Sequence, residues 1–283
     1  MTTPTTTAPR SGLSFGGILT SEWIKLMSLR STIWCYSIVV FLTIVFSLIY
    51  GSTITLEGGI PLDHDTQQAY AVQAATLGVG MSQLVVAVLG ALVITGEYGT
   101  GMIRSTLTAV PTRLPALFGK IVVFGVVTFV ISLVAIVVAA LVSTPLLATN
   151  GVEADLGDPG YWSALVGAAG FLTLSGVFAT AIGTIVRNSA GAIAIVLDLI
   201  LVLPTVVQVF ALITTAEWVA NLSAFLPSNA GSRMYAYVAE NAAADPFGLG
   251  GIVLEPWQGA LVLLAWVAAL LALASVLLKR RDA

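Results

Sequence analysis

The sequence predicts an all-α integral membrane protein. We expect six transmembrane helices, an amphipathic helix at the membrane interface before the first span, and both termini in the cytoplasm. Hydrophobic residues make up 58% of the 283 residues and charged residues only 9%, with a mean hydropathy of +1.00. A soluble domain typically carries about a quarter charged residues. A chain with so little charge cannot cover a water-facing surface and must be solvated mostly by lipid.

The N-terminal region, residues 1–32, is predicted to be cytoplasmic. Residues 1–12 are rich in Thr, Pro and Ser, which is typical of disorder. An amphipathic helix is expected next, with Ser21, Glu22, Lys25 and Ser28 on its polar side. Its apolar side consists of Phe15, Ile18, Leu19, Trp23, Leu26 and Met27. The alternative is a cytoplasmic extension of the first span.

Residues 33–283 form the predicted six-helix transmembrane domain. Each apolar segment is near or above the roughly 20 residues that cross ~30 Å of hydrocarbon. The predicted spans are approximately 33–54, 74–95, 117–144, 162–186, 189–213 and 257–278. The third is long enough to tilt, or to end early near Pro145. The tight Arg187–Asn188 connection makes the fourth and fifth an antiparallel hairpin.

The basic residues predict the orientation. With six spans, all Lys and Arg except Arg233 fall on one side. That side holds Arg10, Lys25, Arg30, Arg104, Arg113, Lys120, Arg187, Lys279, Arg280 and Arg281. The opposite loops, including a long one at about 214–256, are acidic. The excess of positive charge on cytoplasmic loops therefore places both termini in the cytoplasm.

Several kinds of catalytic or nucleotide site are excluded. The single cysteine, Cys35, and single histidine, His64, cannot form the usual zinc sites, and His64 lies in an acidic segment. The only Gly-Lys pair, Gly119-Lys120, lacks the earlier glycine of a phosphate-binding loop, because Leu114 occupies that position. No catalytic, cofactor or metal site is therefore expected in this chain. If ATP supplies the energy, another subunit must bind the ATP and Mg.

The connection between the second and third spans, residues 96–116, is the most informative segment. Glu97 lies where the second span leaves the membrane, and Gly96, Gly99 and Gly101 permit a sharp turn. We expect a short surface helix over 102–109, ended by Pro111. Arg104, Arg113 and Lys120 hold this element at the headgroup level. Two interpretations remain open, a lever for a partner protein and an ordinary basic loop.

This segment resembles the cytoplasmic connection of the ABC type-2 permeases, the membrane subunits of bacterial ABC exporters. The resemblance covers nearly the whole chain. It is carried by the Glu-x-x-x-Gly turn of Glu97 and Gly101, by Pro111-x-Arg113 and by Lys120. It implies a coupling helix that docks on a separate ATP-binding subunit, with Glu97 linking that contact to the transmembrane helices. It also implies a multi-pass protein of the cytoplasmic membrane and a large outer loop between the last two spans.

Two features within the spans have open interpretations. Asp198 lies in the middle of the fifth apolar segment, where a carboxylate usually faces the bundle interior or a wet cavity. It is either a pathway residue or gate, helped by a kink at Pro204, or a hydrogen-bonded group packed between helices. In the fourth span, Ser175, Ala179 and Gly183 recur every four residues, a pattern that allows close helix packing within the chain or between copies.

The favoured function is an ABC exporter permease that moves a hydrophobic or amphipathic substrate such as a drug, a peptide antibiotic or a lipid-like molecule. The expected partners are an ATP-binding cassette subunit, a second permease copy or paralogue, and membrane lipids, but no nucleic acid. The main alternative is an ion- or proton-coupled secondary transporter that uses Asp198. Against it, the chain shows no inverted repeat. An intramembrane enzyme is a third candidate, but the spans offer only one carboxylate.

Overall fold

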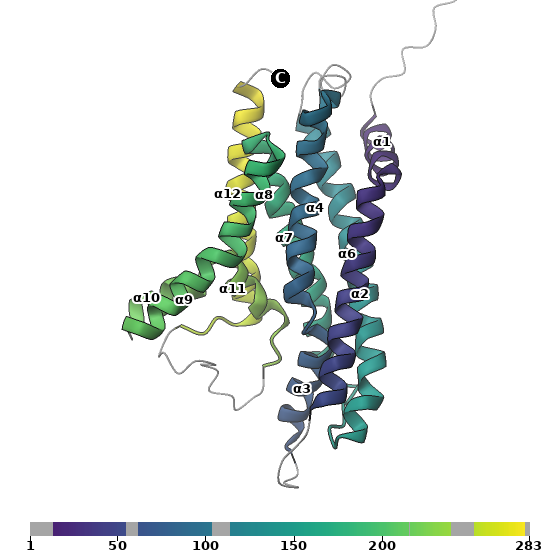
Figure 1. Cartoon of the computed structure of the whole chain (residues 1–283), viewed down its shortest axis with the longest axis vertical. Coiled ribbons are helices and arrows are strands. Elements are labelled where there is room, and N and C mark those ends of the chain that lie inside the picture. The colour runs from purple at the N-terminus through teal and green to yellow at the C-terminus, as the bar shows by residue number, and fades with distance from the viewer. Residues whose placement is uncertain (1–13, 55–61, 104–113, 215, 239–251, 281–283) are drawn as a thin grey trace, which may run out of the picture.

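The chain folds into a helical bundle (Figure 1). The computed structural model describes residues 14–54, 62–103, 114–214, 216–238 and 252–280. Within this part of the chain, six helical stretches are long and apolar enough to cross a membrane, which confirms the predicted fold class. They are α2 (Arg30–Thr53), α3 with α4 (His64–Thr76 and Val79–Thr100), α6 (Leu114–Thr149), α7 (Pro159–Val186), α8 with α9 (Ser189–Leu197 and Leu203–Thr214) and α12 (Pro256–Arg280). A separate helix, α1 (Phe15–Ser28), precedes them.

The two ends of the bundle differ in charge. One end, called here the α1 end, carries α1, the C-terminal end of α4, the start of α6, the α7–α8 turn and the end of α12 (Figure 1). Every described Lys and Arg except Arg233 belongs to these elements or to the start of α2. The starts of α3 and α7 lie at the other end, where the described chain carries Asp63, Asp65, Asp155 and Asp158.

Helices α4 and α7 form the closest helix pair of the core. A Cβ atom added to Gly90 of α4 would collide with the backbone carbonyl of Gly176 in α7, so the two backbones almost touch. Thr180 donates a hydrogen bond of 3.0 Å to the carbonyl oxygen of Gly90 across this contact. The small residues of α7 lie in the same interface and are buried, namely Ser175, Ala179 and Gly183. Close backbone approach between small residues is the usual way in which helices associate within lipid.

Polar side chains connect α2 to its neighbours inside the bundle. The Tyr36 hydroxyl shares a buried hydrogen bond of 2.8 Å with Thr128 of α6. Ser47 donates to the carbonyl oxygen of Ala139, also in α6, at 2.9 Å. Helix α2 also approaches the α3–α4 junction, where a Cβ on Gly78 would lie 2.6 Å from the Cα of Thr43. The junction therefore requires glycine.

Two prolines act differently along the chain. Helix α6 continues through Pro145 to Thr149 instead of ending early near Pro145. In the fifth apolar stretch, the five residues Asp198–Val202 form a π turn directly before Pro204. A proline removes the backbone donor of a helix and crowds the carbonyl four residues earlier. A wider turn ahead of Pro204 relieves this crowding and bends the helix.

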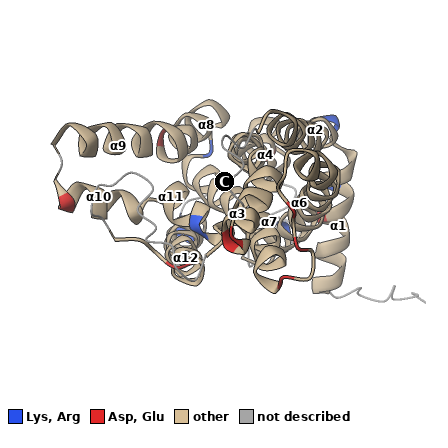
Figure 2. Ribbon diagram, turned by 90° about the horizontal axis from the view of Figure 1, so that it is seen from below, with Lys and Arg blue, Asp and Glu red and all other residues tan. Residues whose placement is uncertain are grey.

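Helix α9 leads away from the bundle, and the chain then folds back (Figures 1 and 2). Two short helices follow, α10 (Glu217–Ala224) and α11 (Pro227–Ser232). Ser228 of α11 donates a hydrogen bond of 3.3 Å to Gln83 in α4, and Gln83 donates to Ser175 in α7 at 3.2 Å. These bonds attach the returning segment to the α4–α7 pair.

Candidate functional site

The site at the α1 end begins with the local structure of α1. Ser14 caps this helix, since its hydroxyl accepts a hydrogen bond of 3.1 Å from the backbone N–H of Gly17. Leu29 is extended and separates α1 from α2. Ile18, Glu22 and Leu26 follow one another at four-residue spacing and form the buried face of α1. This face packs on the start of α6.

The inward position of Glu22 corrects the sequence-based prediction, which placed Glu22 on the polar side of α1. Glu22 is 3% exposed, whereas Phe15 and Trp23, assigned to the apolar side, are each 50% exposed. The burial of Glu22 has an electrostatic reason, because two ammonium groups meet its carboxylate inside the bundle.

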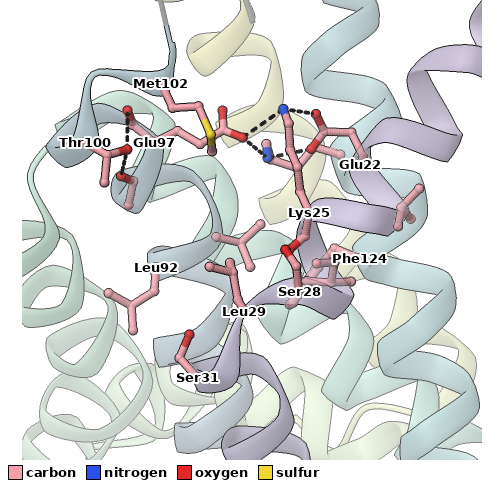
Figure 3. Close-up of a pocket in the computed structure, with 15 residues that line it drawn as sticks. Glu22, Lys25, Ser28, Leu29, Ser31, Leu92, Glu97, Thr100, Met102 and Phe124 are labelled. Carbon is pink, nitrogen blue, oxygen red and sulfur yellow. Dashed lines mark hydrogen bonds and ion pairs between the residues drawn. The ribbon is translucent and has the colours of Figure 1, made fainter.

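Four charged residues meet there in a buried cluster, called here the quartet (Figure 3). It consists of Glu22 and Lys25 from α1, Glu97 from α4 and Lys120 from α6. The Lys120 ammonium lies 2.6 Å from Glu22 and 2.8 Å from Glu97. The Lys25 ammonium lies 2.6 Å from Glu22 and 3.2 Å from Glu97. Figure 3 shows the two carboxylates facing each other with the lysine nitrogens between them. The quartet thus joins three helices through charge pairs.

The quartet balances two negative charges with two positive ones. Glu22, Glu97 and Lys120 are 3%, 4% and 6% exposed, so their charges are stable only because they are paired. Lys25 is 27% exposed and lies at the edge. Burial opposes its charged form, but the hydrogen bond to Glu22 and the charges of Glu97 and Glu22 outweigh burial, so the pKa of Lys25 is raised above 10.5.

One oxygen of the quartet has no hydrogen-bond partner in the part of the chain that the structure describes. Oε1 of Glu97 accepts from both lysines, whereas Oε2 is buried and has no hydrogen-bond partner among the residues that the structure describes. Leaving a buried carboxylate oxygen unpaired costs free energy.

Two members of the quartet, Glu97 and Lys120, lie near the two ends of the predicted coupling segment, residues 96–116. Glu97 lies in the last turn of α4, which ends at Thr100, and Gly101 follows in the left-handed conformation with φ of 73°. Lys120 lies in the second turn of α6. Met102 and Ile103 are helical, but the rest of the predicted surface helix lies outside the described residues. Arg104, Pro111 and Arg113 lie outside them as well.

A second contact joins the end of α4 to the α7–α8 turn. The Arg187 guanidinium lies 5.3 Å from the centre of the Tyr98 ring, a cation–π distance. Arg187 ends α7 with a left-handed φ of 61°, and Asn188 caps α8 by accepting from the N–H of Gly191 at 2.9 Å. The tight connection expected at Arg187–Asn188 therefore lies beside the C-terminal end of α4, the helix that contributes Glu97 to the quartet.

The other predicted residues lie elsewhere. Ser175, Ala179 and Gly183 are in the α4–α7 interface described above. Asp198 opens the π turn, and its side chain is exposed on the surface of the single chain. Pro204 is buried near it. The structure thus brings Glu97 together with Glu22, Lys25 and Lys120, and it does not bring Glu97 together with Asp198.

Glu22 and Lys25 were not predicted as site residues. One signal was available, namely a Glu and a Lys three residues apart on a helix next to an apolar span. That pattern also fits a solvated helix face. Only the packing of α1 against α6 shows that Glu22 belongs to a buried charge cluster and not to a solvated helix face.

The comparison with known families agrees with this architecture. The profile of a family described as ABC-2 family transporter protein matches residues 17–283, nearly the whole chain. No curated protein matches the chain.

Proposed function

Because the chain belongs to the ABC-2 family of transporter proteins, we propose that it is the permease subunit of an ATP-driven exporter. A separate ATP-binding cassette subunit binds ATP and Mg and docks on residues 96–116. The substrate is hydrophobic or amphipathic, of the drug, peptide antibiotic or lipid-like class. The protein resides in the bacterial cytoplasmic membrane, with both termini inside.

The quartet is the observation that carries this proposal. Residues 96–116 connect α4 to α6, and each of these helices contributes a buried charge to the quartet beside that connection. A displacement of the connection by a docked subunit acts on Glu97 and Lys120 directly. Since Glu22 is paired with Lys120, the displacement also reaches α1 and, through Leu29, α2. Charge pairs of low exposure hold these helices together as one unit, so they move together.

The charge distribution supports the orientation. The described Lys and Arg gather at the α1 end, apart from Arg233. Positive charge is in excess on the cytoplasmic side of membrane proteins. In this orientation, a cytoplasmic ATP-binding subunit meets the α1 end. The C-terminal end of α4 and the start of α6 lie at this same end.

A second permease copy, identical or paralogous, completes the pathway in this proposal. Asp198 supports it, since this carboxylate is the tenth residue of the apolar stretch Ser189–Thr214 and is exposed on the single chain. A charged side chain at the centre of a bilayer costs roughly 2.5–3.5 kcal/mol on insertion scales. A second copy, or water in the pathway between two copies, removes this cost. Asp198 and the bend at Pro204 then act at the gate of the pathway.

The test is purification of the tagged protein from its native membrane, with vanadate-sensitive ATP hydrolysis measured on the complex. We expect an ATP-binding subunit to co-purify. Glu97→Gln should retain this subunit but lose the ATP-driven transport of a substrate. Glu217→Gln is the matched control, because Glu217 is exposed on α10, far from the quartet. Retained assembly in Glu97→Gln separates a loss of coupling from a loss of folding.

Two outcomes contradict the proposal. If no ATP-binding subunit co-purifies and transport continues without ATP, the protein is not an exporter of this kind. If transport then stops when the proton gradient is removed and also in Asp198→Asn, the ion- or proton-coupled alternative takes its place. Full ATP-driven transport by Glu97→Gln rejects only the coupling role of the quartet and does not contradict the assignment as an exporter permease.

A further inference from the structure

The turn between α7 and α8 is fastened to the last two turns of α4. The Arg187 guanidinium lies 5.3 Å from the centre of the Tyr98 ring. Ser189, the first residue of α8, donates a hydrogen bond of 3.0 Å to the hydroxyl of the buried Thr95. On the other side of the turn, a Cβ atom on Gly183 of α7 would lie 2.6 Å from a side-chain carbon of α4. The turn and the end of α4 are therefore in contact on both sides of Arg187.

Arg187 has an unusual backbone conformation for an arginine. Its φ is 61°, and it is the only residue other than glycine with a positive φ in the part of the chain that the structure describes. Glycine is the usual residue at such a left-handed position after a helix, because it has no Cβ to crowd the backbone. A strained backbone that persists points to a role of the side chain. The group that glycine would lack here is the guanidinium over the Tyr98 ring.

Tyr98 lies next to Glu97 in the last turn of α4, within residues 96–116. Neighbouring residues of a helix point about 100° apart, so they meet different neighbours. Glu97 meets the lysines of α1 and α6, whereas Tyr98 meets the α7–α8 turn. The last turn of α4 thus has two separate attachments.

Helix α8 leads from the second attachment to the bend in the fifth apolar stretch. It packs on α4 and α7 and ends at the π turn Asp198–Val202. Helix α9 packs mainly on α10 and on this π turn, and it leads away from the bundle (Figure 1). Val206 and Ile213 of α9 are 58% and 76% exposed. The direction of α9 therefore depends on α8 and on the π turn.

We propose that Arg187 is a positioning residue that makes the α7–α8 turn follow the end of α4. When the ATP-binding subunit displaces residues 96–116, Tyr98 moves with them, and the guanidinium over its ring carries the start of α8 along. The π turn and Pro204 convert this displacement into a change in the direction of α9. The inference rests on the proposed function and adds to it a route to the gate that does not pass through the quartet.

Two simpler roles of Arg187 make a different prediction. A cation at the C-terminal end of a helix is stabilised by the helix dipole, and a cytoplasmic arginine favours the correct orientation. Neither role requires the Tyr98 ring. Tyr98→Leu removes the ring and leaves the charge of Arg187 in place, whereas Tyr98→Phe keeps the ring. Arg187→Gly removes the guanidinium and at the same time relieves the left-handed strain, so it should not weaken the turn itself.

The test follows spin labels in the complex of the full chain with its co-purified ATP-binding subunit. Cys35→Ser removes the single cysteine, so one label can be attached at a chosen site. Val206→Cys reports on α9, and in a separate sample Phe41→Cys, at a position that is 63% exposed, reports on α2. Spectra are compared without nucleotide and after trapping with ATP, Mg and vanadate. Both labels should respond in the parent complex.

The variants should act on one label only. Arg187→Gly and Tyr98→Leu should each remove most of the response at α9 and leave the response at α2, while Tyr98→Phe should retain both. The double variant should lose no more than either single variant, because both remove the same contact. Arg280→Gly is the matched control. It also removes an exposed arginine from the α1 end, and it should leave both responses unchanged.

Four outcomes overturn the inference and leave the exporter assignment in place. They are an α9 label that does not respond in the parent complex, an unchanged α9 response in Arg187→Gly or Tyr98→Leu, additive losses in the double variant, and an equal loss in Tyr98→Phe. Loss of both responses in Arg187→Gly also overturns it, because the turn then supports docking or folding in general. If no ATP-binding subunit co-purifies, the proposed function fails, and this inference fails with it.

Discussion

Replacement of Lys120 by methionine tests how strongly the quartet holds α1, α4 and α6 together. Lys120 is 6% exposed and pairs with Glu22 at 2.6 Å and with Glu97 at 2.8 Å. Methionine has a similar length but no charge. The variant therefore leaves two buried carboxylates with only Lys25 to balance them.

The expected loss follows from this geometry. Removal of one partner of a buried ion pair typically lowers the free energy of unfolding by about 3–5 kcal/mol, because the remaining charge stays buried. For a chain of this size each kcal/mol corresponds to roughly 2–4 °C in melting temperature. Lys120→Met should therefore melt about 6–20 °C below the wild type.

The assay is thermal unfolding of the purified chain in a fixed detergent or lipid nanodisc. Lys279→Met is the matched control, because Lys279 is exposed at the end of α12, and it should melt close to the wild type. The double variant Glu22→Gln with Lys120→Met removes one charge of each sign. It should recover a large part of the loss, since the two sites are in contact and their effects are not additive. If Lys120→Met melts like Lys279→Met, the quartet does not stabilise the bundle.

Two further predictions concern packing and pH. Gly90→Ala should lower the free energy of unfolding by about 1–3 kcal/mol, because its Cβ meets the rigid carbonyl of Gly176, whereas Gly80→Ala, with open surroundings, should not destabilise the protein. Melting temperatures of both variants check this, and equal melting would contradict the close α4–α7 contact. The raised pKa of Lys25 means that its stabilising charge is fully present below pH 10.5 and is lost as the pH rises through the higher folded-state pKa. The difference in melting temperature between wild type and Lys25→Met should therefore be constant near neutral pH and shrink above pH 10.5, and a difference that shrinks already at neutral pH would refute this assignment.

The quartet differs in kind from a surface salt bridge. An exposed pair contributes about 0–1 kcal/mol and is screened by salt. In the quartet, three of the four side chains are almost fully buried, and each carboxylate contacts both lysines. Such a cluster is costly to disrupt and has a specific geometry, which fits the coupling role that we propose for it.

The sequence by itself determined the class of the protein and the number of its spans. Apolar runs of about 20 residues can exist only in lipid or in a buried core, and a chain with 9% charged residues has too little charge to be anything but lipid-solvated. The same simple physics predicted the tight Arg187–Asn188 connection, since two apolar segments separated by two polar residues must form a hairpin. Glu97 was singled out because its position at the end of a span is visible along the chain.

Only the tertiary structure decided what Glu97 meets. Glu22, Glu97 and Lys120 are separated by 98 residues at most, and nothing local indicates that they share one site. The amphipathic pattern of α1 correctly placed Ile18 and Leu26 on the apolar side, but it put Glu22 on the polar side, whereas Glu22 is buried among its charged partners. The bend at Asp198 similarly depends on a π turn that no periodicity predicts. A hydrophobic pattern reports how each residue partitions between water and lipid. Pairing between distant charges arises only when helices pack.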